Sequence, residues 1–150
     1  MTNATNTTTT NTTTITMALL TMGSVRQELT AEKRLRNILA AQIAIAKQRY
    51  EDALAKFLAA VQRDPADAIE MRARHMITAQ VRHEVWAMIE RDLAEHGPRE
   101  VLAKNLAICH RRMRHFCRFG MAANGVDCAK AGAVVRLVAL LEDLTRRFGR

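Results

Sequence analysis

Hydrophobic residues recur at helical spacing along most of the chain. From residue 39 to residue 60, apolar and small side chains follow alternating steps of four and three residues, which is a heptad pattern. This heptad stripe consists of Leu39, Ile43, Ala46, Tyr50, Ala53, Phe57 and Ala60. It predicts a long helix over about 25–63, with one side packed against an antiparallel neighbour or against a second copy of the chain.

A second helix is predicted over about 65–95. Asp64 is expected to cap it and Pro65 to occupy its first position, where a proline is well tolerated. The apolar residues of its two halves lie on faces more than 90° apart at 100° per residue. We therefore expect either a kink near residues 78–80 or different packing partners along its length. The two sets are Ala66, Ile69, Ala73 and Met76, and Val81, Val85, Met88, Ile89 and Leu93.

Two shorter helices are predicted after Gly97-Pro98. The first covers about 98–119, and the second about 128–148 with Asp127 as its N-cap. Their apolar stripes are Leu102, Leu106, Cys109, Met113 and Phe116, and Val134, Leu137, Val138, Leu141, Leu144 and Phe148. Two long and two shorter helices with short connections predict an all-α helical bundle of about four helices.

The N-terminal segment differs in composition from the rest. Residues 1–16 are almost entirely Thr and Asn, so they bury too little apolar area to offset their ordering entropy. We expect a disordered tail over residues 1–23 and a single all-helical domain over residues 24–150. Met17 and Met22 follow closely, and translation is hypothesised to start at one of them. The sequence shows no secretory or membrane-spanning pattern, and three cysteines without a disulfide framework favour a cytoplasmic location.

Part of the long helix carries a spacing of small and large residues followed by a proline. The positions are Tyr50, Ala53, Phe57, Ala60-Val61 and Pro65, followed by Ala66-Asp67-Ala68. This segment resembles the second helix and exit of a tetratricopeptide repeat, which implies a helical adaptor for a protein partner. The resemblance covers about 20 residues. The chain departs from it at Arg74 and His75, where a following repeat has a leucine and a small residue.

Positive charge is concentrated near the C-terminal end. The chain has a formal charge of +8, and no acidic residue stands between Val101 and Val126. On a helical wheel, most basic residues of helix 98–119 lie opposite its apolar stripe and form a ridge about 20 Å long. This basic ridge is assigned Lys104, Arg111, Arg112, Arg114, His115 and Arg118. It predicts a non-enzymatic accessory protein that contacts the phosphate backbone of a nucleic acid.

An alternative function is an interaction module or inhibitor acting through helices 25–63 and 65–95. Its interface would include Tyr50, Phe57 and Trp86, because aromatic side chains often anchor protein interfaces. The basic ridge would then meet an acidic protein surface, and helix 25–63 would allow a homo-oligomer. Substitution of Arg111, Arg114 and Arg118 distinguishes the two functions, because it abolishes the first and spares the second.

Catalysis, metal binding and a cofactor are not expected. Ser24 is the only serine, and neighbouring acidic residues diverge by 100° around a helix. Cys109 and Cys117 stand eight residues apart on one helix, about 12 Å along its axis, which is too far to share a zinc ion. Cys109 is instead expected in the core.

Overall fold

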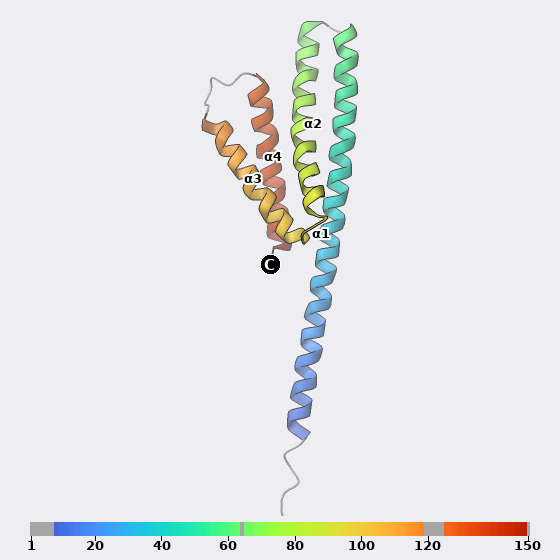
Figure 1. The fold of residues 1–150 in the computed structure, drawn as a ribbon, viewed down its shortest axis with the longest axis vertical. Coiled ribbons are helices and arrows are strands. Elements are labelled where there is room, and N and C mark those ends of the chain that lie inside the picture. Colours follow the sequence, from blue (N-terminus) through green and yellow to red (C-terminus); the bar gives the residue numbers. More distant parts are fainter. Residues whose placement is uncertain (1–7, 64, 119–124, 150) are drawn as a thin grey trace, which may run out of the picture. The chain divides into compact units, whose positions relative to one another are not determined.

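The protein is built entirely from helices in the part of the chain that the structure describes. The computed structural model describes residues 8–63, 65–118 and 125–149, with side chains from residue 25 onward except those of residues 117 and 118. The four helices are α1 (Thr8–Arg63), α2 (Ala66–Asp92), α3 (Pro98–Arg118) and α4 (Gly125–Phe148), as Figure 1 shows. The predicted all-α class, with two long and two shorter helices, is confirmed.

Helix α1 begins earlier than the sequence indicates. Its first residue is Thr8, whereas the heptad stripe predicts a start near Val25. Residues 8–23 extend the helix, and the first seven residues of the tail expected over residues 1–23 lie outside the described part. No proline interrupts this stretch, so a helix nucleated further along gains one hydrogen bond for each added residue. The chain divides into two compact units, residues 1–34 and residues 35–150.

Within the unit of residues 35–150, α1 and α2 form an antiparallel pair. Arg36 Nη1 donates to the Leu93 carbonyl oxygen at 3.3 Å, and the ring of Tyr50 stacks on that of His83. Each of the seven positions of the heptad stripe is buried or half-buried, while most neighbouring positions are exposed. The stripe therefore faces α2, and the predicted antiparallel packing is confirmed.

The start of α2 differs by one residue from the prediction. Pro65 is the N-cap and not the first helical residue, because its backbone is extended (φ −66°, ψ 159°). Its carbonyl oxygen accepts bonds from the backbone nitrogens of Ala68 and Ile69 at 3.0 and 3.2 Å. No side chain caps this end, and Asp64 lies outside the described residues.

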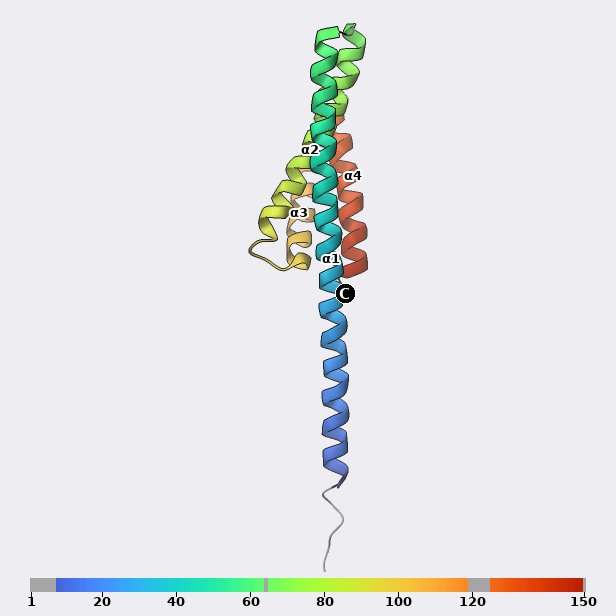
Figure 2. The same cartoon turned by 90° about the vertical axis from the view of Figure 1, so that its right-hand side faces the viewer.

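Helix α2 is continuous through residues 78–80, and its environment changes there. Its four buried residues all lie in the second half: Val81, Val85, Trp86 and Ile89. Figures 1 and 2 show α3 beside this half, whereas the start of α4 also reaches the first half of α2, where the two helices line one cavity. Different packing partners thus explain the two apolar faces predicted for α2.

The core lies where α2, α3 and α4 meet the first part of α1. Leu35 and Leu39 of α1 enter it, together with Val101, Leu102 and Cys109 of α3. The predicted stripe of α4 supplies much of the remainder, from Val134 to Leu144, and Phe148 packs at its edge. The predicted apolar stripes of α3 and α4 are both confirmed. Burial of these stripes fixes which side of α3 faces water.

Candidate nucleic-acid interface

The exposed side of α3 carries three of the residues predicted to bind nucleic acid. Arg111, Arg114 and His115 are exposed, because the opposite side of the helix is buried against α4 and α2. Within the described residues, no carboxylate forms an ion pair with Arg111 or Arg114. These two guanidinium groups are therefore available to an external anion.

Lys104 is placed differently from the prediction. Its Nζ lies 2.9 Å from Asp92 Oδ1 at the end of α2, so its charge is neutralised within the protein. Asn105, which is buried, donates to Asp92 Oδ2 at 2.9 Å and to the Val101 carbonyl oxygen at 3.0 Å. The hydrogen bond from Lys104 and, to a smaller extent, the one from Asn105 lower the pKa of the Asp92 carboxyl below its ordinary value. Lys104 thus ties α3 to α2, and the basic ridge is shorter than predicted.

Two further basic residues of α3 make internal contacts. Arg112 is half-buried, and its Nη2 donates to Met88 Sδ of α2 at 3.9 Å. His110 Nε2 lies 3.0 Å from Glu142 Oε1 of α4. The side chain of Arg118 lies outside the described residues. The exposed cations of the ridge are therefore centred on Arg111 and Arg114.

A groove of about 610 Å³ lies between α2, α3 and α4 beside this centre. Arg111, Arg112 and His115 line it from α3, and Lys130 lines it from α4. Sequence reasoning missed Lys130, which is far from the ridge along the chain and approaches it only because α4 folds back against α3. The remaining lining residues are Gln80 and Glu84, and the apolar Ile77, Val81, Phe116, Val126 and Val134.

The cysteines behave as core and surface residues. Cys109 is fully buried, as predicted, and burial raises the pKa of its thiol, although the charge of Arg112 lowers it in part. Cys128 is exposed. Among the described side chains, which exclude that of Cys117, no three histidine, cysteine or acidic residues gather in a way that would hold a metal ion.

The residues predicted for a protein interface do not form a surface. Trp86 is 1% exposed and belongs to the core, so its assignment as an interface anchor is corrected. The cause is the convergence of three helices on the second half of α2, which the sequence pattern of α2 alone does not indicate. Tyr50 and Phe57 are half-buried, and the ring of Tyr50 stacks on His83 of α2. The large exposed apolar residues near the α1–α2 turn are instead Leu58, Val61 and Met71.

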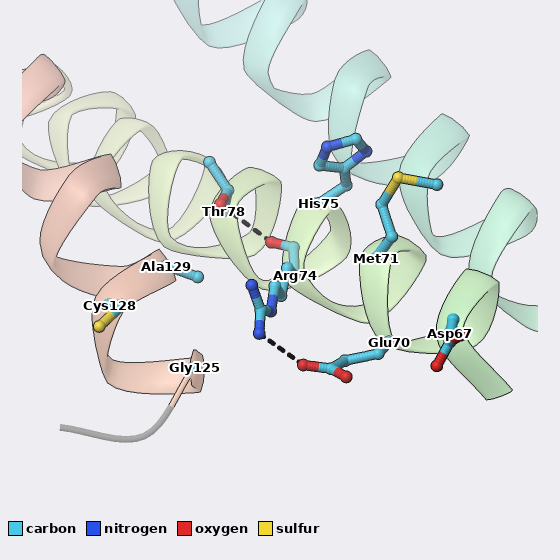
Figure 3. A pocket seen from close by; sticks show the side chains of 9 residues that line it. All are labelled: Asp67, Glu70, Met71, Arg74, His75, Thr78, Gly125, Cys128 and Ala129. Atoms are coloured by element: carbon cyan, nitrogen blue, oxygen red, sulfur yellow. Dashed lines mark hydrogen bonds and ion pairs between the residues drawn. The ribbon is translucent and has the colours of Figure 1, made fainter.

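A second open cavity, of about 640 Å³, lies between the first half of α2 and the start of α4. Figure 3 shows Arg74 pointing across it toward Gly125 and pairing with Glu70. A Cβ atom at Gly125 would lie 3.0 Å from Arg74 Nη2, so a glycine allows this close approach. Because its arginine is already paired within the helix, this cavity offers less to an anion than the exposed side of α3.

Comparisons with known proteins add no relative. No protein-family model matches the chain, and no curated protein or solved structure is similar to it. None of the described helices is long and apolar enough to cross a membrane.

Proposed function

We propose that the protein binds nucleic acid through its phosphate backbone, using the exposed side of α3 around Arg111 and Arg114. The observation that carries this proposal is that both guanidinium groups are exposed and form no ion pair with any carboxylate of the described residues, on a helix whose only acidic residue is Glu100. Guanidinium groups bind phosphate oxygens in a two-pronged geometry. Lys130 flanks the same surface and extends it onto α4.

The side chains present favour backbone contact over reading of bases. Phe116 is half-buried against the core and offers no stacking platform for a base. Phosphate contacts position a protein on nucleic acid without carrying sequence information. The proposed role is therefore that of a non-enzymatic accessory protein with little sequence preference. A reducing, cytoplasmic location agrees with the free thiol of Cys109 in the core.

The test is the salt dependence of binding to duplex DNA and to RNA. If Arg111, Arg114 and Lys130 each neutralise one phosphate, the logarithm of affinity falls with the logarithm of salt with a slope of about −2.7 on duplex DNA. Arg114→Gln is expected to reduce this slope by about 0.9 and to weaken binding equally for all sequences. Arg91→Gln, an exposed arginine of α2, is the matched control and should leave the slope unchanged. Absence of binding at low salt, or equal effects of both substitutions, would refute the proposal.

A second candidate function is contact with a protein partner, including a second copy of the chain. It is favoured by Leu58, Val61 and Met71, which are 50–55% exposed close to the α1–α2 turn. Leu58→Glu with Val61→Glu should abolish such an association and leave nucleic-acid binding intact. Sedimentation equilibrium of the wild type and of this double variant measures the homo-oligomer directly. A wild-type protein that is monomeric at high concentration argues against self-association.

A further inference from the structure

Two arginines from neighbouring helices, Arg49 of α1 and Arg82 of α2, line one cavity away from the exposed side of α3. The charges of Arg49 and of Arg136 in α4 both act on Arg82, so the three residues form an arginine cluster around Arg82. Arg82 is half-buried, and burial, followed by these two charges, lowers the pKa of its guanidinium. Across the described ranges, none of the three arginines forms an ion pair with a carboxylate.

A cavity of about 130 Å³ opens beside this arginine cluster, between α1 and α2. Arg49 and Arg82 line it, together with the apolar side chains of Ile45, Ala46, Ala79 and Trp86 and the polar side chains of Gln42, His75 and Thr78. A protein cavity of about 150 Å³ is known to hold benzene. Positive charge and a largely apolar space of about that size therefore lie side by side.

Like charges with no described carboxylate at ion-pair distance are unfavourable, and part burial increases the cost because water screens them less. An anion bound among these arginines would add an attraction to each guanidinium group that offsets their mutual repulsion. Guanidinium groups suit carboxylate and phosphate, since two parallel N–H groups match two oxygens. The apolar lining adds affinity for a ligand that also carries a small hydrophobic group.

We infer that Arg49 and Arg82, supported by the positive charge of Arg136, form a binding site for a small organic anion. The carboxylate or phosphate group of the ligand lies among the guanidinium groups, and an apolar group of about the size of a benzene ring fills the cavity between α1 and α2. This site uses none of the α3 residues of the proposed nucleic-acid interface, so either proposal can fail without the other.

Phenyl phosphate, inorganic phosphate and phenol are suitable probes, compared at constant ionic strength. Trp86 is the only tryptophan and lines the cavity, so its fluorescence reports on binding. Phenyl phosphate should bind saturably, about tenfold more tightly than inorganic phosphate, because it also buries its ring. Phenol should bind weakly, because it lacks the charge. Equal effects of phenyl phosphate and inorganic phosphate, or no saturable change with any probe, would overturn the inference.

Two substitutions separate the charge from the cavity. Arg82→Met keeps an apolar stem and removes the guanidinium, so phenyl phosphate should bind at least about tenfold more weakly. Without ligand, the same variant should melt at the same or a higher temperature, because a repelled charge is lost. Ala79→Leu should fill the cavity and lower the affinity for phenyl phosphate to that for inorganic phosphate. Arg91→Met changes the net charge equally and should leave binding unchanged.

Other outcomes contradict the site. If Arg82→Met binds phenyl phosphate normally, the arginine cluster does not hold the anion. If Arg82→Met lowers the melting temperature by several degrees without ligand, Arg82 stabilises the fold, and Arg49→Met, at an exposed position, decides the inference. Arg49→Met should weaken the binding of phenyl phosphate, and normal binding by this variant would overturn the inference. If duplex DNA competes with phenyl phosphate and Arg82→Met abolishes binding of both, the arginines belong to the nucleic-acid surface.

Discussion

The phenol ring of Tyr50 in α1 lies flat against the imidazole ring of His83 in α2. The ring centroids are 5.1 Å apart and the planes differ by 7°. Since the two helices are antiparallel, this stack and the Arg36–Leu93 hydrogen bond join them at two separate levels. The stack fixes the register of the pair between Ala46 and Ala53 of the heptad stripe.

The stack should contribute measurable coupling energy to folding. In a double-mutant cycle with Tyr50→Leu and His83→Leu, we expect a coupling of about 0.5–1.5 kcal/mol, as for other stacked aromatic pairs. Urea denaturation followed by circular dichroism measures each free energy of unfolding. Strictly additive effects of the two substitutions would show that the contact does not stabilise the pair.

Positions of the heptad stripe should differ in their contribution to stability. Leu39 is fully buried, so Leu39→Ala should cost about 2–5 kcal/mol. Phe57 is only half-buried, and Phe57→Ala should cost roughly half of the 3–5 kcal/mol that a fully buried phenylalanine gives. Equal losses, measured by chemical denaturation, would mean that Phe57 is more enclosed than the structure shows.

The Asp92 carboxylate links α2 to α3 in a way that depends on pH. Its pKa in the folded protein is lowered, so its stabilising effect is complete above the ordinary carboxyl range and is lost as pH falls through the lowered pKa. Asp92→Asn should reduce stability by about 1 kcal/mol at neutral pH. The difference in melting temperature between wild type and Asp92→Asn should shrink below about pH 4. A difference that is constant from pH 7 to pH 3 would contradict this.

The cysteines should react with thiol reagents at very different rates. Cys109 is buried and its thiol pKa is raised, so little of the reactive thiolate is present and access is blocked. Cys128 is exposed and should be alkylated by iodoacetamide within minutes in the folded protein. Peptide mapping by mass spectrometry identifies the modified residues. Labelling of Cys109 should require denaturant, and rapid labelling in its absence would refute this assignment.

Apolar periodicity was sufficient to predict the helices and their buried sides. The stripes of α3 and α4 lie where the pattern places them, since each depends only on the spacing of residues within one helix. Contacts between helices were not predictable in this way. The pairing of Lys104 with Asp92 and the burial of Trp86 both depend on how α2 meets its neighbours. The same holds for the arginine cluster, whose members stand far apart in the sequence on three helices.

The distribution of buried residues along the α1–α2 pair implies that the two ends of the pair open independently. Between Ala46 and Val81, Ala60 is the only residue that is fully buried among those described. Backbone amides near the turn are therefore held by helical hydrogen bonds with little tertiary support, and they should exchange with deuterium much faster than those of Val85 or Leu137. The part of the protein next to the anion cavity would then belong to its least protected cooperative unit. A ligand bound in this cavity would slow the hydrogen–deuterium exchange of backbone amides in both α1 and α2.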